Sequence, residues 1–450
     1  MGINIRYLSN KIGIDSAIIY TILARMIQAG GGVISIIFIA KYLSKQEQGF
    51  YFTFGSILAI QIFFELGLSG IITQFVAHET AHIDWVGKAK LVGSDRSISR
   101  LSSLLRFCLK WFVVVAIFLM LLLIVTGFLF FYKYGKGSSQ VNWQNPWIIL
   151  SISTAFSLMV SPVLAFFEGL GKVNEIAKIR LIQQSVQLLM LFVFLTKGFK
   201  LYSSPLASVC TFMIAPLWII FSYRINLLFF IWNQLGKWKV NYKFEIFPYQ
   251  WRIALSWISG YFIFQLFNPV LFANDGPIVA GQMGMTLAVL NGVLSISLSW
   301  INTKVPLFSI LISKREFIRL DEIFKKTVKQ ASLICAICLL ILLIVVFIMQ
   351  FKDMSVGQRF VPIVPLVLLS LVTFINQLVS ALATYLRCHK QEPLLTVSLL
   401  TGIFTATSTF ILGNLFGMEG MVIGYFCINI FLGLPWVFYI FKTKKLEWHS

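Results

Sequence analysis

The sequence predicts an all-α polytopic membrane protein with about twelve transmembrane helices. Of its 450 residues, 58% are hydrophobic and only 12% are charged, whereas a soluble globular protein carries about 25% charged residues. Apolar runs of about 20 residues recur along the chain, which is the length a helix needs to cross roughly 30 Å of hydrocarbon. These runs do not alternate polar and apolar residues as the strands of a membrane barrel do, so the spans are predicted to be helices.

Twelve apolar segments are predicted to cross the membrane. The stretch from Trp111 to Tyr132 contains no charged residue, and the stretch from Ala331 to Met349 is similar. In chain order the segments lie near 16–42, 50–77, 109–132, 146–167, 176–196, 204–223, 251–273, 278–303, 330–350, 361–386, 394–414 and 418–441.

The distribution of Lys and Arg predicts the orientation, because cytoplasmic loops of membrane proteins are enriched in both. With twelve spans, the two ends and the even-numbered loops share one side, and that side holds 28 of the 37 Lys and Arg. The other side holds eight, and Arg25 lies inside the first span. We therefore expect a multi-pass membrane protein with both termini in the cytoplasm and no cleavable signal. The net charge of +20 follows from this topology and from contact with anionic lipid headgroups, so no nucleic-acid partner is expected.

Residues 78–82 read HETAH, the H-E-x-x-H pattern that places two zinc-binding imidazoles one helical turn apart. The motif falls at the predicted cytoplasmic end of the second span. The Asp-Gly pair at Asp275 is predicted on the opposite side, a bilayer thickness of roughly 30 Å away. Without a convincing third ligand, the sequence favours a polar helix end over a metal site.

Three stretches carry a resemblance to a known family. They are IAKYLSKQEQGFYFTFGSILAIQIFFELGLSGIITQFVAHE (39–79), GPIVAGQMGMTLAVLNGVLSISLSWINTKVP (276–306) and ATYLRCHKQEPLLTVSLLTGIFTATSTFILGNLFGMEGMVIGY (383–425). Together with the order of the spans, they resemble the Wzx-type polysaccharide (O-antigen) flippases of the multidrug/oligosaccharidyl-lipid/polysaccharide (MOP) exporter superfamily. The resemblance covers essentially the whole chain as a pattern of segments, and no single motif in it is diagnostic.

The resemblance implies two six-helix halves around a central cavity, residues 1–224 and 251–450, joined by a cytoplasmic linker at 225–250. Short glycine-containing turns open both the second and the eighth span, which is a weak sequence similarity between the two halves. Repeats of this kind underlie alternating access in transporters, in which one half rocks against the other.

The resemblance also implies a transported substrate. Family members move an undecaprenyl-pyrophosphate-linked oligosaccharide from the cytoplasmic to the periplasmic leaflet for surface polysaccharide assembly, and no bond is made or broken. The resemblance therefore implies a place in the bacterial cytoplasmic (inner) membrane. We therefore expect a transporter rather than an enzyme, without a cofactor or metal, with a proton or sodium gradient as the candidate energy source. The expected partners are the lipid-linked oligosaccharide, the bilayer, a polysaccharide polymerase and a chain-length regulator.

Ionisable residues inside spans are costly and are functional candidates by default. Arg25 lies roughly 13 Å into the first span at 1.5 Å per residue, and the resemblance implies that it contacts pyrophosphate. Its guanidinium can hold phosphate oxygens through two parallel hydrogen bonds. Glu65 lies at a similar depth in the second span, so a structural ion pair with Arg25 is an equal alternative, and Glu65 is also a candidate carrier of a coupling proton. Gln28 is a further candidate on the first span.

Polar side chains of later spans are softer candidates for lining the cavity, with helix-to-helix hydrogen bonds as the alternative for each. Near the cytoplasmic end, Lys304 also has the alternative of reaching the headgroups. The substrate-binding candidates from these spans are Arg180, Gln265, Asn268, Asn291, Lys304, Asn376 and Gln377.

Two other functions stay open at this level. A multidrug exporter of the same superfamily would share the fold, but an exporter of cations favours an acidic cavity, whereas the first span here carries Arg25. A polysaccharide polymerase or membrane glycosyltransferase would usually present long outer loops with catalytic residues. The predicted outer loops are short and carry no such residues.

Overall fold

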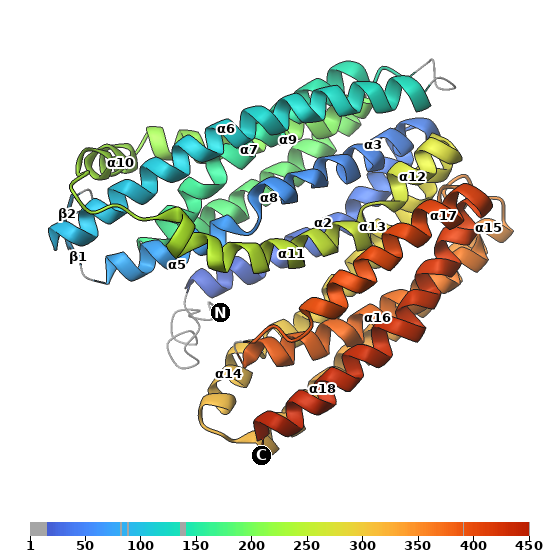
Figure 1. Ribbon diagram of the computed structural model, residues 1–450. Helices are drawn as coiled ribbons and strands as arrows, with labels where there is room; N and C mark the ends of the chain where they lie inside the picture. The colour runs from blue at the N-terminus through green and yellow to red at the C-terminus, as the bar shows by residue number, and fades with distance from the viewer. Residues whose placement is uncertain (1–15, 82, 88–89, 136–140, 390, 450) are drawn as a thin grey trace, which may run out of the picture. The chain divides into compact units, whose positions relative to one another are not determined.

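A computed structural model describes residues 16–449, apart from 82, 88–89, 136–140 and 390 (Figure 1). The side chains of some residues within helices, Arg25 and Gln28 among them, also lie outside the described part. Apart from the two short strands, the described elements are helices. Nine of them, within the described residues, are long and apolar enough to cross a membrane. The prediction of an all-α polytopic membrane protein is confirmed.

Each of the twelve predicted spans has a helical counterpart. The last two lie in one helical stretch, Leu395–His449, which is divided at Gly417 by a non-helical backbone conformation with φ 58° and ψ −142°. A positive φ of this kind favours glycine, which has no Cβ. The first part of the chain holds α2 (Ser16–Tyr42), α3 (Lys45–Leu58), η1 (Ala59–Gln61), α4 (Ile62–Glu65), α5 (Leu68–Thr80), β1 (Ile83–Val86), β2 (Lys90–Gly93), α6 (Asp95–Tyr134), α7 (Gln144–Gly169), α8 (Val173–Thr196), η2 (Lys200–Tyr202), α9 (Ser203–Ile220), α10 (Tyr223–Asn233) and the π-helix η3 (Tyr242–Ile246).

The later elements complete the spans. They are α11 (Phe247–Phe264), α12 (Phe267–Asn274), α13 (Pro277–Asn302), α14 (Val305–Ser313), α15 (Phe317–Phe351), η4 (Gly357–Arg359), α16 (Ile363–Cys388), α17 (Leu395–Cys427), the π-helix η5 (Ile428–Gly433) and α18 (Leu434–His449).

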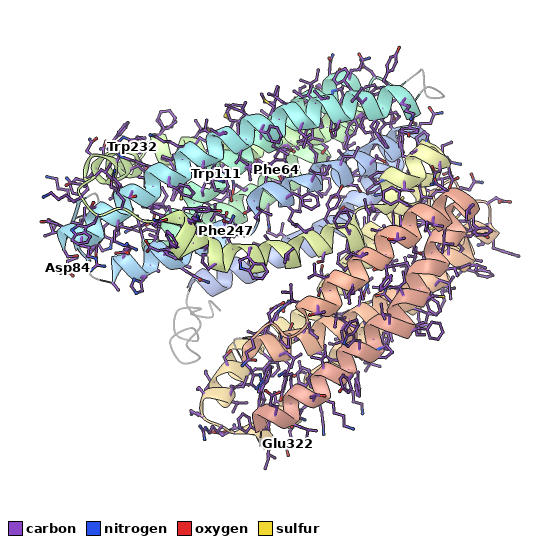
Figure 2. The ribbon with its side chains drawn as sticks, viewed as in Figure 1. Phe64, Asp84, Trp111, Trp232, Phe247 and Glu322 are labelled. Atoms are coloured by element: carbon purple, nitrogen blue, oxygen red, sulfur yellow. The ribbon has the colours of Figure 1, made fainter. Side chains whose placement is uncertain are left out.

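Two long helices extend well beyond their predicted spans. Helix α6 begins at Asp95 and α15 at Phe317, more than ten residues before the apolar runs. The Ser94 hydroxyl accepts a hydrogen bond from the Ser97 N–H, and Asp95 lies in the first turn of α6. A capping hydroxyl and an acidic residue both stabilise a helix N-terminus. The chain directly before α6 forms the antiparallel hairpin of β1 and β2; Asp84 of β1 is labelled in Figure 2.

Packing divides the chain into two compact units that do not follow chain order. Unit 1 contains Ile60–Tyr132 and Asn142–Trp257 together with the start of α2, and unit 2 contains Ala29–Ala59 and the chain from Ile258 onward, with a short stretch at 133–141. Helix α3 therefore packs with the C-terminal helices. The predicted division into halves 1–224 and 251–450 stays a prediction.

In unit 1, Trp147 fixes α7 against α6. Its side chain is fully buried, and its indole N–H donates to the Leu123 carbonyl at 2.9 Å. The ring lies where a Cβ on Gly127 would fall, 2.0 Å from Nε1. Glycine therefore allows this helix contact. Next to it, α5 packs on α7, and α9 packs on both α7 and α8.

In unit 2, α3 and α13 approach each other so closely that only glycine fits at the contact. A Cβ on Gly49 would lie 1.9 Å from the carbonyl oxygen of Pro277, and one on Gly284 would lie 2.3 Å from the Cβ of Phe52. Small residues at helix contacts let membrane helices pack at short range. Figure 1 shows the blue α3 beside the yellow α12 and α13.

Hydrogen bonds fasten the start of α3 to the same unit. Gln48, which is 1% exposed, donates to the Gly281 carbonyl at 2.8 Å and accepts from Nη1 of Arg359 at 2.9 Å. Nη2 of Arg359 donates to the Leu43 carbonyl at 2.7 Å. Because hydrogen bonds to a charged donor are among the stronger ones, Arg359 ties α3 to η4 at this end.

A polar and aromatic cluster joins the C-terminal ends of α16 and α18. Tyr385 donates to Asp321 at 2.8 Å, and the Lys445 ammonium lies 2.6 Å from the same carboxylate. The Nε2 atoms of His389 and His449 are 3.4 Å apart. Nδ1 of His389 lies 3.2 Å from the Tyr385 carbonyl oxygen, which can only accept, so Nδ1 carries the proton of neutral His389 and Nε2 is the unprotonated nitrogen.

The His389 cluster is expected to weaken as the pH falls. Burial lowers the pKa of His389, against smaller raising effects of the Tyr385 carbonyl and Asp321. A lowered folded-state pKa contributes stability above the unfolded value of about 6.5, and this contribution is lost as the pH falls through the folded value. Hydrogen exchange of the last turns of α18, corrected for intrinsic rates, should accelerate between pH 7.5 and 5.5. The pKa of His449 is also lowered, mainly by burial, so the variant His389→Phe should lose only part of that dependence. An unchanged dependence would assign it to other groups.

Candidate functional site

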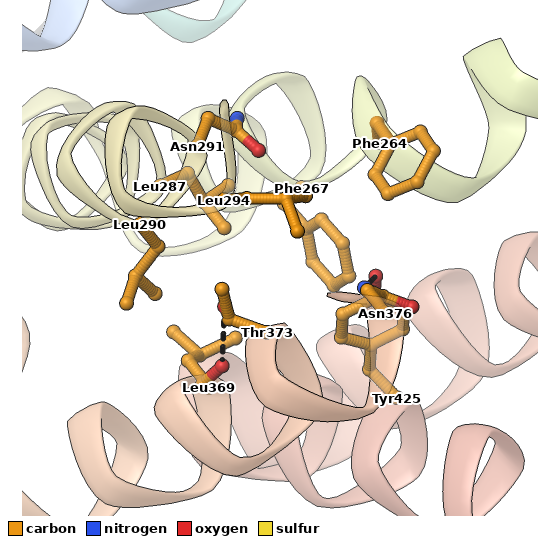
Figure 3. A pocket seen from close by; sticks show the side chains of 10 residues that line it. All are labelled: Phe264, Phe267, Leu287, Leu290, Asn291, Leu294, Leu369, Thr373, Asn376 and Tyr425. Atoms are coloured by element: carbon orange, nitrogen blue, oxygen red, sulfur yellow. Dashed lines mark hydrogen bonds between the residues drawn. The ribbon is translucent and has the colours of Figure 1, made fainter. Parts of the chain in front are cut away.

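A pocket lies in unit 2 where α12, α13, α16 and α17 meet (Figure 3). Its empty space is about 380 Å³, a figure that includes space open to solvent. The side chains that line it are Phe264, Phe267, Leu287, Leu290, Asn291, Leu294, Leu369, Thr373, Asn376 and Tyr425.

The polar groups of the pocket are amides and hydroxyls. Nδ2 of Asn376 donates to the Tyr425 hydroxyl at 3.1 Å, and Thr373 donates to the Leu369 carbonyl at 2.8 Å. The rings of Phe267 and Tyr425 meet edge to face at 5.1 Å. Asn291 is exposed on α13. The described lining contains no charged side chain, so the pocket suits an uncharged ligand with hydroxyl groups better than an ion.

Two of the predicted residues, Asn291 and Asn376, thus lie in one pocket, brought together by α13 and α16. Two others are buried next to neighbouring helices. Asn268 donates to the Ser56 hydroxyl at 3.0 Å, and Gln377 accepts from Ser332 at 3.0 Å. Each keeps a buried amide atom without a partner in the described structure, Oδ1 of Asn268 and Nε2 of Gln377. Their hydrogen bonds link α12 to α3 and α16 to α15.

A second polar site, in unit 1, is built around Glu65. The second predicted span breaks directly after it, because Leu66 and Gly67 both have positive φ values of 48° and 68°. The Ser69 hydroxyl donates to Oε1 of Glu65 at 2.7 Å, and the Ser161 hydroxyl lies 3.4 Å from the same oxygen. A carboxylate at a broken span resembles the way transporters build ion and substrate sites. The predicted ion pair with Arg25 lies outside the described residues, as does the side chain of Gln28.

The remaining predicted residues lie elsewhere. Nη2 of Arg180 binds Glu168 at 2.7 Å, with half of the Arg180 side chain exposed. Gln265 is half-buried next to the pocket wall residue Phe264, and Lys304 is exposed at the start of α14. The assignment of these residues to substrate binding stays a prediction.

The HETAH stretch forms an ion-pair site in the described residues. Glu79 is 8% exposed, and its Oε1 accepts from Nε of Arg100 at 2.6 Å. Within the described part of the chain, no group of three His, Cys, Asp or Glu has the arrangement of a metal site. His82 lies outside that part.

The aromatic members of the pocket were not predicted from the sequence. In a chain with 43 Phe, Phe264 and Phe267 carry no signal that separates them from lipid-facing residues. Tyr425 carries one, because its hydroxyl stands inside an apolar span and a buried phenol usually finds a hydrogen-bond partner. Thr373 also carries no sequence signal, because a threonine in a span can satisfy its hydroxyl within its own helix, as Thr373 does in α16.

The comparisons with known proteins bear on the fold. No family model matches the chain, and no curated protein sequence matches it. Solved structures do match over nearly the full length. An inward-facing multidrug resistance MATE family transporter of the MOP superfamily matches with a TM-score of 0.59 at 13% identity, covering 94% of this chain and 99% of that one.

Two further solved structures are equally similar. The lipid II flippase MurJ, in an inward closed conformation, matches with a TM-score of 0.60 at 13% identity over 96% of this chain and 90% of that one. The MATE multidrug transporter DinF-BH in complex with R6G matches with a TM-score of 0.61 at 14% identity over 95% and 94%. The chain has the fold of the MOP-superfamily transporters. At these identities the likeness shows the fold, and that fold is shared by multidrug transporters and a lipid II flippase.

Proposed function

We propose that the protein is a flippase that moves undecaprenyl-pyrophosphate-linked oligosaccharide units from the cytoplasmic to the periplasmic leaflet of the bacterial inner membrane. The product would feed surface polysaccharide assembly, as O-antigen or capsule. The observation that carries the proposal is the uncharged pocket in unit 2, whose lining combines two amides, two hydroxyls and aromatic rings with four leucines. Sugar rings offer hydroxyls to amides and C–H faces to aromatic rings, so this lining fits a saccharide.

The pyrophosphate requires a cation elsewhere. The sequence places such a cation, Arg25, in the first span, and a guanidinium matches the geometry of phosphate oxygens. The MOP fold supports transport without chemical conversion, which argues against a polymerase or glycosyltransferase. Glu65, at the break between α4 and α5, is the proposed carrier of a coupling proton, with two hydroxyls donating to it.

The second candidate function is multidrug export, which the match to DinF-BH favours. A cationic drug would be bound best by a carboxylate in the pocket, and the described lining has none. The pocket chemistry therefore favours the flippase.

The test is a leaflet-resolved assay of lipid-linked units in a host strain deleted for the gene. Lectin or glycosidase added to intact spheroplasts and to inverted vesicles reports which leaflet holds the units. Complete units that accumulate on the cytoplasmic face, with loss of surface polymer, support the proposal. Single units that reach the outer face normally would indicate a role in polymerisation. If the deletion changes neither the lipid-linked units nor the surface polymer, drug export becomes the favoured function.

Removing one amide from the pocket is expected to reduce transport moderately. Asn376→Leu keeps the approximate volume and removes the hydrogen bonds to Tyr425 and to the substrate, each worth about 1 kcal/mol. We expect surface polymer synthesis to slow roughly 5- to 30-fold. The matched control Asn302→Leu changes an exposed residue at the end of α13 and should have no effect. Equal rates of polymer synthesis in the two variants would show that the pocket does not take part in transport.

A further inference from the structure

The sequence predicts a linker at 225–250, and the structure docks most of it, the segment 223–246 between α9 and α11, along the N-terminal extension of α6. Ser99 of α6 donates to the Trp238 carbonyl at 2.7 Å and accepts from the Gly236 N–H at 2.9 Å. Further along the helix, the Ser103 hydroxyl accepts from the Val240 N–H at 3.2 Å. This contact lies within unit 1 (Figure 1).

Two arginines of α6 hold the same segment at two further points, the end of α10 and η3. Nη2 of Arg106 donates to the Trp232 carbonyl at 2.6 Å, and its guanidinium lies 4.9 Å from the Trp232 ring centre. Arg100 lies between two carboxylates, with Nη2 2.5 Å from Glu245 and Nε 2.6 Å from Glu79. The pKa of Glu245 is lowered mainly by its hydrogen bond with Arg100. The linker is therefore a fixed part of the surface, and its carboxylate is neutralised internally.

The contacts of Tyr242 set the depth of the linker relative to the membrane. Its ring lies 5.0 Å from that of Phe107 and 6.4 Å from that of Trp111. Trp111 opens the charge-free run of α6. The headgroup layer occupies roughly 5–8 Å on each side of the hydrocarbon, so η3 lies at headgroup level on the predicted cytoplasmic side.

The outward side of the linker combines exposed lysines with exposed aromatic rings. Lys239 and Lys243 are exposed, and neither pairs with a carboxylate in the described structure. Next to them, the side chains of Trp238 and Phe244 are 54% and 73% exposed. Aromatic residues are enriched at the membrane interface, and basic residues there attract anionic lipids.

We propose that the docked linker is a binding site for an anionic phospholipid headgroup of the cytoplasmic leaflet. Lys239 and Lys243 would bind the headgroup phosphate, and Phe244, next to Tyr242 at the membrane end of the linker, would lie among the upper acyl carbons. Trp238 lies farther from the hydrocarbon, because it contacts Ser99, which precedes Trp111 by about 18 Å along α6 at 1.5 Å per residue, and because its ring lies 5.1 Å from the Arg96 guanidinium. The occupant is a lipid because the site is at headgroup depth and its exposed side is both basic and aromatic. The site is distinct from the pocket of unit 2 and does not depend on which substrate that pocket takes.

Native mass spectrometry of the purified full-length protein tests the site. Phosphatidylglycerol and phosphatidylcholine of the same acyl chains are titrated against the wild type and against Lys239→Gln/Lys243→Gln. The wild type should retain phosphatidylglycerol preferentially, and the double variant should bind it about 10- to 30-fold more weakly, with unchanged phosphatidylcholine binding. Added salt should reduce the wild-type preference.

The matched control is Lys325→Gln/Lys326→Gln, which removes two exposed lysines from the extension of α15. It should keep the wild-type preference, and thermal unfolding should confirm that both double variants are folded. Equal retention of the two lipids by the wild type would overturn the proposal, and an acidic protein partner would then become the candidate occupant. An equal loss in both double variants would also overturn it, because the attraction would then be diffuse rather than local to the linker.

Discussion

Gly49→Ala is expected to destabilise the protein severely and to stop transport. The added Cβ would lie 1.9 Å from the carbonyl oxygen of Pro277, which is a backbone atom that cannot rotate away. Helix α3 would have to move away from α13, and Gln48, one residue before, would lose its bond to the Gly281 carbonyl. Overpacking typically costs about 1–3 kcal/mol and occasionally more. We expect the upper end of this range, measured as a lower melting temperature in detergent and loss of surface polymer.

Gly55→Ala is the matched control for this change. It makes the same substitution in the same helix, and a Cβ there has no atom within 4 Å. Alanine has the higher helix propensity, so this variant should be as stable as the wild type or slightly more stable. If both variants melt like the wild type, the close contact between α3 and α13 does not exist in the folded protein.

Arg25→Ala is expected to abolish surface polysaccharide while the protein stays in the membrane. The proposed role of Arg25 is to hold the pyrophosphate of the substrate, and hydrogen bonds to charged groups contribute about 1.5–3 kcal/mol each. Loss of two such bonds predicts a transport rate at least about 100-fold lower. The assay is surface polymer per unit of membrane-inserted protein, and Arg25→Glu should behave like Arg25→Ala.

Two further variants separate substrate binding from an ion pair. Arg319→Ala removes an exposed arginine of α15 whose partner is Glu316, three residues before it, and should leave polymer unchanged. If Arg25 only neutralises Glu65, then the double variant Arg25→Ala/Glu65→Gln should recover activity. If Arg25 binds the substrate, the double variant should stay inactive. Wild-type polymer from Arg25→Ala would remove the residue from the mechanism.

The positions of the spans could be predicted from the sequence because hydropathy measures transfer into lipid, a property of each segment alone. The extension of α6 could not be found this way, since Asp95 to Lys110 carries too much charge for a span, and hydropathy does not report a helix in water. The docking of the linker could not be predicted either, because it depends on backbone carbonyls such as those of Trp232 and Trp238, and every residue has such a carbonyl whatever its side chain.

The candidate pocket was predictable only in its amides. Asn291 and Asn376 are conspicuous in apolar spans, since a polar group in the membrane is costly without a partner. Which amides face a pocket and which join helices is a tertiary property. Asn376 and Gln377 are adjacent in sequence, yet one contacts Tyr425 of α17 and the other Ser332 of α15. Successive residues of a helix point about 100° apart, so only the packing of α16 assigns them.

The assignment of α3 to unit 2 has a consequence for biosynthesis. Helix α3 ends at Leu58 and its partner α13 begins at Pro277, so about 220 residues are synthesised between them. At about 5–20 residues per second, α3 leaves the ribosome roughly 10–45 s before α13 exists. During that interval the glycine surface of α3 is without its partner helix. The core of unit 2 therefore forms late in synthesis, and nonsense or frameshift products that stop before α13 should be recognised by membrane quality control with α3 unpaired.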